Sequence, residues 1–372
     1  MIQPSAPSPA PLGLDSGAAQ LSPGSPNAPL PPAGNGAGSS LAASAAQLAL
    51  LDGKSVLITG GTGSFGRAFV DRALASRARK VIVFSRDEQK HYVLERQYSD
   101  RRMRFFVGDI RDRDRLQTAL RDVDIVIHAA AMKHVPICEY NPIEAVQTNV
   151  HGARNLIEAA MSCGVERVIA LSTDKAVSPA NLYGATKLCM EKLVIAANAY
   201  AGARATRVSV VRYGNVMGSA GSVIPLFRSQ RSRGQLTITD ARMTRFWIEM
   251  ADAIGLVLRG LQLMIGGEIF IPKLPTTDIE TLAEAVAPGV PRSTVGIRPG
   301  EKLHETLIST EEARRTSDLG DVLVIWPEFQ FHTTLSGARP GIPVPEGFVY
   351  SSDSAKPRLD LDATRAMLER VA

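Results

Sequence analysis

The stretch KSVLITGGTGSFGRAFVDRALAS, residues 54–76, decides the fold of this 372-residue chain. It opens with a short apolar run that ends in glycine, which is typical of a buried parallel strand. The part from residue 66 onward has the pattern of a helix. Gly60, Gly63 and Gly66 lie between these two elements with GxxGxxG spacing, so the backbone can turn tightly and approach a pyrophosphate at the helix N-terminus. The stretch predicts a dinucleotide site, and a glycine-rich turn without a ligand is the alternative.

Strand-like and helical stretches alternate from there to about residue 215. The strand-like runs are KVIVFS (80–85), MRFFVG (103–108), DIVIHAA (124–130), RVIALS (167–172) and RVSVVRYG (207–214). Helical stretches cover 113–120, 142–164 and 181–201. This alternation predicts a doubly wound parallel α/β sheet, a Rossmann domain over residues 51–215. Shorter elements and Pro/Gly breaks beyond it favour a smaller C-terminal lobe, residues 216–372, that mainly binds substrate.

Residues 1–50 differ in composition from the rest of the chain. They contain nine prolines, and Asp15 is their only charge. Such a segment cannot bury enough apolar surface to offset its ordering entropy, so we expect a disordered extension. It has no signal-peptide or transit-peptide pattern, and a wrongly assigned start codon would also explain it. Residues 39–51 could form a short helix capped by Ser39 or Ser40.

The overall composition excludes several classes of protein. Apolar residues make up 45% of the chain, the net charge is only +5, and the basic residues are scattered. This argues against nucleic-acid binding and suits a small anionic substrate. The three cysteines form no CxxC and the six histidines show no ligand spacing, so we expect no metal and a reducing cytoplasm. No run of about 18 apolar residues predicts a membrane span.

The end of the second predicted strand indicates which cofactor binds. Its sequence FSRDEQK places Ser85 and Arg86 where an NAD enzyme usually carries an acid for the ribose 2′-hydroxyl. A hydroxyl and a guanidinium can bind a 2′-phosphate, so NADP is favoured, although Asp87 and Glu88 keep NAD open and Arg86 could simply be solvated. The other positions expected at the cofactor are Gly61, Thr62, Ser64, Phe65, Lys90, Asp109, Ile110, Ala129, Ala130, Lys133, Leu171, Ser172, Tyr183, Lys187 and Val216.

The segment after the fifth predicted strand carries catalytic residue types. Tyr183 and Lys187 are four apart and share one helix face. Free tyrosine, with a pKa of about 10, is a poor base at pH 7. The charges of Lys187 and a nicotinamide, with a hydrogen bond from Thr173, would favour its phenolate. An ordinary helix pair is the alternative. Asp174 and Lys175 exceed what hydride transfer needs, and a loop ion pair is an equally good interpretation of them from the residues alone.

The glycine loop and the YxxxK motif resemble those of extended short-chain dehydrogenases/reductases that act on nucleotide sugars. Longer stretches are similar to the inverting UDP-N-acetylglucosamine 4,6-dehydratases, which make the first intermediate of pseudaminic acid. These stretches are HAAAMKHVPICEYNP, LSTDKAVSPANLYGATK, VRYGNVMGSAGSVIPLF, MTRFW and VGIRPGEKLHE. The similarity runs from about Gly53 to the end of the chain. A dehydratase of the dTDP-glucose type would carry Asp-Glu at the position of Asp174 and Lys175.

The resemblance implies a catalytic set of Thr173, Asp174, Lys175, Tyr183 and Lys187. Oxidation at C4 of the sugar acidifies the C5 proton. Lys175, its pKa depressed by neighbouring positive charge, would remove that proton, while a protonated Asp174 would release the C6 hydroxyl as water. Hydride then returns to C6, and C5 is reprotonated from the opposite face. NADP would therefore stay tightly bound and be recycled in each turnover.

The resemblance also implies contacts with the substrate. Asn215 would hold the hexose or its phosphate, and backbone donors of residues 219–225 would hold the diphosphate. Arg245 and Arg298 would clamp the diphosphate, although either could be a solvated side chain, and Glu301 would accept from the uridine ribose. The full set of expected substrate contacts is Lys133, Asn215, Ser222, Val223, Arg245, Arg298 and Glu301.

Three other functions remain open at this point. A C5-retaining nucleotide-sugar 4,6-dehydratase would differ only in the face of reprotonation. A nucleotide-sugar 4-epimerase would not need Asp174 and Lys175. A non-catalytic NADP-sensing protein would be expected to lose Tyr183 or Lys187. The resemblance implies UDP-N-acetylglucosamine as the substrate and a homo-oligomer as the assembly.

Overall fold

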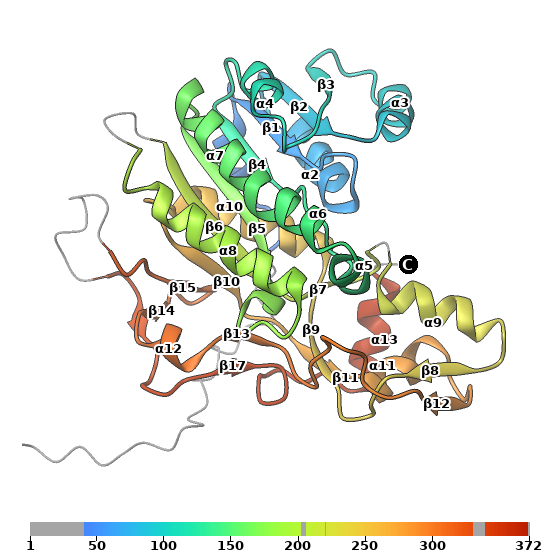
Figure 1. The fold of residues 1–372 in the computed structure, drawn as a ribbon. Coiled ribbons are helices and arrows are strands. Elements are labelled where there is room, and N and C mark those ends of the chain that lie inside the picture. The colour runs from blue at the N-terminus through green and yellow to red at the C-terminus, as the bar shows by residue number, and fades with distance from the viewer. Residues whose placement is uncertain (1–40, 202–205, 220, 330–338, 371–372) are drawn as a thin grey trace, which may run out of the picture.

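The computed structural model describes residues 41–201, 206–219, 221–329 and 339–370. A large, mostly parallel sheet lies between layers of helices (Figure 1), with the strand order β16-β14-β15-β10-β6-β5-β4-β1-β2-β3. The strands from β3 to β10 are parallel, and β15, β14 and β16 extend the sheet antiparallel. This confirms the predicted fold class. The bounds in chain order are β1 Ser55–Thr59, β2 Lys80–Ser85, β3 Met103–Val107, β4 Ile125–His128, β5 Arg167–Thr173, β6 Arg207–Tyr213, β10 Ile269–Pro272, β14 Thr316–Asp318, β15 Val322–Ile325 and β16 Ile342–Pro343.

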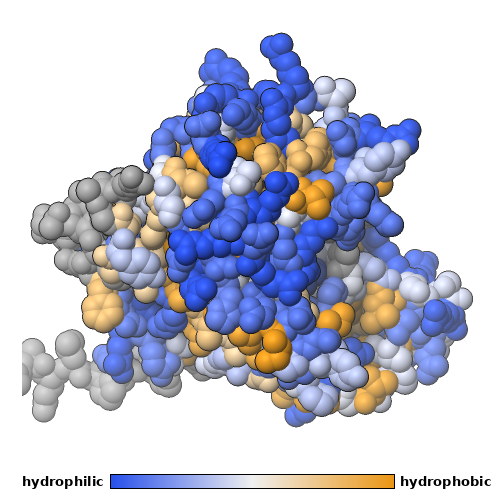
Figure 2. Space-filling view, turned by 45° about the horizontal axis from the view of Figure 1, so that its top comes forward, coloured by the Kyte–Doolittle hydropathy of each residue, from blue (hydrophilic) through white to orange (hydrophobic). Residues whose placement is uncertain are grey.

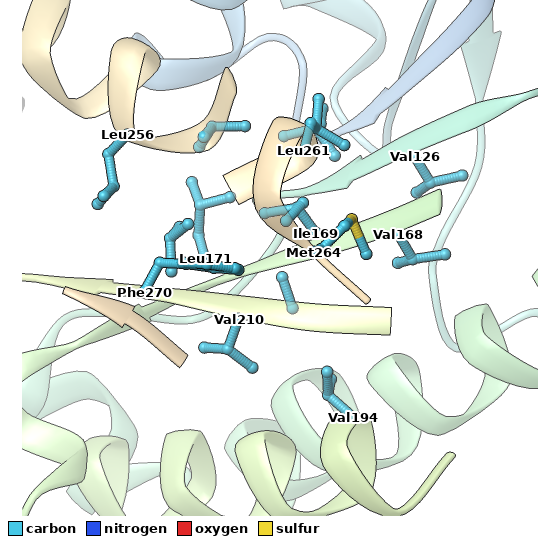
Figure 3. Packing of buried hydrophobic residues seen from close by; sticks show 14 of the residues in the cluster. Val126, Val168, Ile169, Leu171, Val194, Val210, Leu256, Leu261, Met264 and Phe270 are labelled. Atoms are coloured by element: carbon cyan, nitrogen blue, oxygen red, sulfur yellow. The ribbon is translucent and has the colours of Figure 1, made fainter. Parts of the chain in front are cut away.

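Helices cover both faces of this sheet, which explains why its central strands are mostly apolar and almost wholly buried. All residues of β1 are buried, as expected for a parallel strand with helices on both sides. Figure 3 shows Val194 of α8 on one side of the strands and Leu256 and Leu261 of α10 on the other. The helices around the sheet are α2 Ser64–Ala75, α3 Glu88–Gln97, α4 Arg113–Ala119, α5 Val135–Tyr140, α6 Pro142–Val146, α7 Gly152–Cys163, α8 Leu182–Ala197 and α10 Met250–Leu263.

The described structure includes elements before the predicted boundary at residue 51. Ser44 caps the short helix α1 (Ala45–Leu48) with a complete capping box, and Leu51 at the end of the next turn is fully buried. The carbonyl of Leu41 packs against α10, where a Cβ atom on Gly255 would lie 1.4 Å from its oxygen. Only glycine permits this approach. The predicted caps Ser39 and Ser40 lie outside the described residues.

The chain after β6 does not all form a separate lobe, which differs from the predicted division at residue 215. Strands β10, β14 and β15 belong to the main sheet. Helix α10 also returns to this sheet, because it is apolar along most of its length and is buried against it. A second apolar core lies below the sheet (Figure 1) and is built mainly from α9 Val223–Arg231, β8 Leu236–Ile238, α11 Ile279–Val286, α13 Leu361–Glu369 and Trp247 of β9 Thr244–Ile248. The buried residues of β13 Thr306–Ile308, α12 Thr310–Ala313 and β17 Tyr350–Ser351 belong instead to the main core. The other short strands are β7 Asn215–Val216, β11 Thr276–Asp278 and β12 Arg292–Thr294.

The surface carries mostly hydrophilic side chains on the face drawn in Figure 2, with apolar residues in scattered groups. Ile137, Tyr140 and Ile143 are among the exposed large apolar residues, and all three belong to α5 and α6. Within the described ranges, no helix has the length and apolar character needed to cross a membrane.

Candidate active site

The glycine loop between β1 and α2 is too tightly closed to admit side chains. A Cβ atom on Gly66 would lie 2.5 Å from the Cα of Gly61. One on Gly60, which has φ 67°, would lie 2.9 Å from the backbone nitrogen of Ala130. Gly63 is the N-cap of α2 and offers no side-chain acceptor, so the first N–H groups of the helix are left for another partner. This backbone cradle fits a pyrophosphate group.

The acid at the end of β2 is already engaged by its neighbour. Asp87 caps α3, accepting from the Lys90 N–H at 3.0 Å, and also pairs with the Lys90 ammonium at 2.8 Å. The hydroxyls of Ser85 and Thr62 lie 2.8 Å apart and join this strand end to the glycine loop. The carboxylate of Asp87 is therefore already bonded to Lys90. The side chain at the end of β2 that lies beside the glycine loop is the Ser85 hydroxyl.

Arg86 is half-exposed and lies next to Asp109. Asp109 follows β3 and is one of the residues predicted to contact the cofactor. The Nη1 of Arg86 is 3.6 Å from the Asp109 carboxylate, which also accepts from the Arg111 guanidinium at 2.8 Å. Ile110 is buried and packs against the position of Gly152 on α7. Arg86 thus keeps a weakly held guanidinium at the edge of the predicted cofactor site.

Asn149 organises the site, although sequence reasoning missed it. It lies in a single π-helical turn, Gln147–His151, between α6 and α7. Its Oδ1 accepts from Met132 N–H at 2.8 Å, and its Nδ2 donates to the Met132 carbonyl at 2.9 Å and to Thr186 Oγ1 at 3.0 Å. The segment that follows β4, which includes Ala129 and Ala130, is thereby fixed to α8. One extra residue in a helical turn leaves no clear mark in the apolar pattern.

The predicted catalytic residues lie in residues 173–187, called the catalytic run below. This run begins with the last residue of β5 and continues into helix α8. The Thr173 hydroxyl donates to Asp174 Oδ1 at 2.9 Å, and Lys175 Nζ donates to the same oxygen at 3.0 Å. The Asp174 side chain is fully buried, and its Oδ2 has no hydrogen-bond partner within the described ranges. The Lys175 side chain keeps 23% exposure. The structure therefore joins three of the predicted catalytic residues in one network, of which Lys175 is the accessible member.

A second acid, Glu305, meets Lys175 from the C-terminal part of the chain. Its Oε1 lies 3.3 Å from Lys175 Nζ. Burial disfavours the lysine charge, but the attraction of Asp174 and Glu305 outweighs it and raises the pKa of Lys175 above its ordinary value. The expectation of a depressed pKa is wrong for this structure, because two carboxylates, not positive charges, dominate around the ammonium. Glu305 stands in the quoted stretch VGIRPGEKLHE, yet nothing in that sequence indicates its partner.

Tyr183 and Lys187 lie on the first two turns of α8. The buried Lys187 ammonium donates to the Leu171 carbonyl at 2.6 Å. Burial lowers the pKa of Lys187 to about 8, with Glu191 one turn further along opposing the shift. Burial also raises the pKa of Tyr183 to about 12, against the opposing effects of Lys175 and a hydrogen bond with Thr173. Tyr183 therefore needs further positive charge near its oxygen before it can act as a base at neutral pH.

Three of the predicted substrate residues, Arg245, Arg298 and Glu301, lie in or against one loop, residues 298–305. Arg245 donates to the main-chain carbonyls of Leu303 and Lys302 at 2.9 and 3.0 Å, so its guanidinium holds this loop. Arg298 is about half-exposed and lies 4.0 Å from Glu301, three residues further along. Arg298 and Glu301 are thus available at the surface, whereas part of Arg245 is used within the fold.

The same loop is attached to the catalytic run. Asn181 caps α8 by accepting from the Gly184 N–H, and its Nδ2 donates to the Gly300 carbonyl at 2.7 Å. Lys302 Nζ donates to the Val177 carbonyl at 2.6 Å. These contacts bring residues 298–305 over the segment that contains the predicted catalytic residues.

The remaining predicted residues lie at neighbouring element ends. Ser64 and Phe65 begin α2, and Phe65 stacks on Phe69 with ring centroids 6.0 Å apart. Ser172 is buried in β5, and its hydroxyl has no partner within the described ranges. Lys133 is exposed in the segment after β4. The others belong to the first part of the lobe: Asn215 and Val216 form β7 beside β9, Ser222 precedes α9 and Val223 begins it.

Comparisons with known proteins agree with this arrangement. The model of a family described as polysaccharide biosynthesis proteins matches residues 56–327. The chain is 50% identical over 315 residues to a UDP-N-acetylglucosamine 4,6-dehydratase (inverting) of Campylobacter jejuni, covering 82% of this chain and 94% of that protein. It is 45% identical over 278 residues to a UDP-glucose 4-epimerase of Rickettsia bellii, covering 72% and 81%.

Two solved structures share the fold. Pen from Bacillus thuringiensis has 36% sequence identity and a TM-score of 0.80, covering 86% of this chain and 99% of that one. The dTDP-glucose 4,6-dehydratase DesIV from Streptomyces venezuelae, solved with NAD bound, has 27% identity and a TM-score of 0.61, covering 74% and 93%. The second protein holds a nicotinamide cofactor on a Rossmann-type sheet of the same kind.

Proposed function

Since this chain belongs to the family of polysaccharide biosynthesis proteins, we propose that it is a UDP-N-acetylglucosamine 4,6-dehydratase that inverts C5. Its product would be UDP-2-acetamido-2,6-dideoxy-β-L-arabino-hex-4-ulose. The observation that carries the proposal is the Asp174–Lys175 pair, which the Thr173 hydroxyl joins at the end of β5. A reaction that only moves hydride has no use for this pair, whereas an elimination requires both an acid and a base.

The cofactor is a nicotinamide dinucleotide, and we propose NADP. The glycine cradle would hold its pyrophosphate. Asp87 is occupied by Lys90, while Ser85 and the half-exposed Arg86 offer a hydroxyl and a guanidinium for a 2′-phosphate. When bound, the cofactor would supply a hydride acceptor for C4 and a hydride donor for C6, so it would be regenerated in each turnover and would not need to leave.

Tyr183 would remove the proton of the C4 hydroxyl in the first half of the reaction. Its pKa of about 12 must fall by roughly 5 units to match neutral pH, which corresponds to about 7 kcal/mol. The Lys175 ammonium and the Thr173 hydroxyl already act in that direction at the site. The cationic nicotinamide would supply the rest of the positive charge.

Lys175 and Asp174 would perform the elimination by moving two protons. The ion pair of a lysine and an aspartate holds one acidic proton, and passing it from nitrogen to oxygen gives a neutral amine beside a carboxylic acid. In that form Lys175 can take the C5 proton while Asp174 gives its proton to the departing C6 hydroxyl. The pair then returns to the charged form that the structure displays. The raised pKa of Lys175 opposes the neutral amine, so this transfer costs free energy that substrate binding would have to supply.

The substrate contacts remain proposals built on placement. Arg298 and Glu301 on the accessible loop would bind the diphosphate and the uridine ribose, with Arg245 behind them. Asn215, Val216, Ser222, Val223 and Lys133 would line the sugar and phosphate end. A homo-oligomer in the cytoplasm that serves pseudaminic acid synthesis completes the proposal.

The proposal is tested by incubating the purified protein, loaded with NADP, with UDP-N-acetylglucosamine in D₂O and analysing the product by NMR. We expect a 4-keto-6-deoxy sugar with deuterium at C5 and L-arabino configuration, formed without added reductant. No turnover would refute the assignment, and a D-xylo product as the first species would identify a retaining dehydratase.

A 4-epimerase is the second candidate, because the Rickettsia bellii relative carries that name. In the same NMR experiment an epimerase would give UDP-N-acetylgalactosamine, with the C6 hydroxyl intact and hydrogen at C5.

A further inference from the structure

Glu305 lies at the junction between the C-terminal part of the chain and the catalytic run. It directly precedes β13, and its N–H donates to Ser352 Oγ at 2.9 Å while the Ser352 N–H donates to its carbonyl at 2.8 Å. Its carboxylate points the other way, toward Lys175, at 3.3 Å. The backbone of Glu305 is therefore fixed, and the fold places its acid beside the lysine.

The Glu305 side chain is buried in a way that a purely structural carboxylate would not be. The residue is 2% exposed, and its Oε2 has no hydrogen-bond partner within the described ranges. The same is true of Asp174 Oδ2. Buried carboxylate oxygens without partners are costly, and fold-stabilising acids usually satisfy both oxygens. The two acids instead share one cation, Lys175.

The charged and titratable groups that face Lys175 come from both parts of the molecule: Asp174, Tyr183, Arg245, Lys302 and Glu305. The two neighbouring cations donate to main-chain carbonyls, Arg245 to residues 302 and 303 and Lys302 to Val177. The two carboxylates are thus the direct counter-charges of the Lys175 ammonium. Their attraction keeps its pKa above the ordinary value despite burial.

We propose that Glu305 is a positioning residue for the elimination step: its carboxylate holds the Lys175 nitrogen beside Asp174, so that Lys175 can take the C5 proton while Asp174 protonates the C6 hydroxyl. This inference rests on the proposed function. In the step, the C5–H bond breaks, its electron pair forms the C5–C6 double bond, and the C6–O bond breaks. The hydroxyl leaves as water with the proton of Asp174, and Glu305 neither gains nor loses a proton.

The consequence is that Glu305 affects one half of the reaction only. Oxidation at C4 depends on Tyr183 and Lys187, whereas C5 deprotonation depends on where the Lys175 nitrogen is held. Glu305→Gln weakens the contact that holds this nitrogen, although it also increases the fraction of neutral amine. We expect the loss of position to dominate, so C5 deprotonation should slow while C4 oxidation stays intact, and the reduced cofactor should accumulate during the first turnover.

The kinetic test compares wild type, Glu305→Gln, Glu305→Asp and the control Glu311→Gln, an exposed acid on α12. Each NADP-loaded enzyme is mixed with UDP-N-acetylglucosamine, unlabelled or deuterated at C5, and reduced nicotinamide is followed by its near-ultraviolet absorbance. We expect Glu305→Gln to lose about tenfold to a hundredfold in kcat with little change in KM, to accumulate reduced cofactor and to show a larger C5 isotope effect. Glu305→Asp should recover part of the rate, and Glu311→Gln should match wild type.

A second measurement needs no turnover. Carbamylation by cyanate reports the neutral fraction of a lysine, and mass spectrometry follows Lys175 across a range of pH. Removing the Glu305 charge should lower the pKa of Lys175, so Glu305→Gln should react faster than wild type at a given pH, while Glu311→Gln should not.

The outcomes separate the two proposals. If wild type forms no 4-keto-6-deoxy sugar, the proposed function fails, and the cyanate profile alone decides whether Glu305 governs Lys175. If wild type turns over and Glu305→Gln matches it in reduced cofactor, isotope effect and cyanate reactivity, the positioning role is overturned. The role would also be overturned if Glu305→Gln slowed C4 oxidation and elimination equally while the cyanate reactivity of Lys175 stayed unchanged.

Discussion

The side-chain nitrogen of Lys187 lies 2.6 Å from the main-chain carbonyl oxygen of Leu171, so helix α8 is bonded to strand β5 two residues before that strand ends at Thr173. This hydrogen bond therefore fixes helix α8, which carries Tyr183, relative to the end of β5, where the catalytic run begins. The orientation of Tyr183 toward Thr173 and Lys175 follows from it.

The pKa of Lys187 leads to a prediction for the pH profile. Below about pH 8 the ammonium is charged and favours the Tyr183 phenolate, and above it this charge is lost. We expect kcat/KM for UDP-N-acetylglucosamine to fall as the pH rises through about 8. Lys187→Arg, which keeps its charge, should move the fall to higher pH. A flat profile up to about pH 10, where an ordinary lysine titrates, would contradict this role.

Replacing Lys175 should separate oxidation from elimination. Lys175→Ala removes the proposed C5 base, so we expect kcat to fall by at least about a hundredfold while NADP stays bound. The readouts are product formation by NMR and the cofactor content of the purified protein. Lys192→Ala, an exposed lysine on α8, is the matched control. Near-normal turnover of Lys175→Ala would remove it from the mechanism.

Replacing Asp174 should block only the loss of water. Asp174→Asn cannot protonate the C6 hydroxyl, but it leaves Lys175 and removes one of the charges that keep that lysine protonated. We expect recovered UDP-N-acetylglucosamine to gain deuterium at C5 in D₂O while little 4-keto-6-deoxy product forms. Asp240→Asn in the C-terminal part serves as the control. Normal product formation would show that another group supplies the proton.

The choice of NADP can be tested at Arg86. Loss of its charged hydrogen bond to a 2′-phosphate should cost about 1.5–3 kcal/mol, a factor of about 10 to 100 in NADP affinity, with little effect on NAD. Dissociation constants measured by titration calorimetry check this, with Arg96→Ala on α3 as the control. Equal losses of affinity for NADP and NAD would mean that Arg86 does not bind the 2′-phosphate.

A buried ion pair predicts a large effect on stability. Arg212 on β6 is fully buried and pairs with Glu191 on α8 at 2.6 Å and with Glu312 on α12 at 2.9 Å. Arg212→Met leaves both acids without their cation, which typically costs about 3–5 kcal/mol in the free energy of unfolding. Urea unfolding measures it. Arg365→Met, at a surface pair with Asp362, should leave the unfolding curve unchanged.

The sequence predicts the sheet well where strands are buried on both faces. The run KVIVFS, residues 80–85, matches β2 to the residue, because a parallel strand covered on both faces has a continuous apolar and buried middle. The C-terminal strands were not predicted. The segment β14, Thr316–Asp318, is three residues long and polar, and its place beside β15 is set by pairing that leaves no periodic pattern.

The candidate site shows the same limit. The glycine loop and the Tyr183–Lys187 spacing are local signals and could be identified from the sequence alone. The groups around Lys175 are not close to it in the sequence, because Glu305 belongs to the C-terminal part of the chain and contacts Lys175 only in the fold. The sign of the shift in the pKa of Lys175 depends on that contact, so only the folded structure could correct it.

Asn181 gives the molecule one further property through its two hydrogen bonds. Its side chain caps helix α8 and donates to the Gly300 carbonyl, so Asn181 joins the start of this helix to the loop 298–305, as Lys302 and Glu305 join other parts of that loop to the catalytic run. Chimaeric enzymes that exchange the C-terminal part between relatives would separate these partners. Residues 173–187 and 298–305 should therefore be transplanted together as one cassette, and recombination between them should give folded but inactive hybrids.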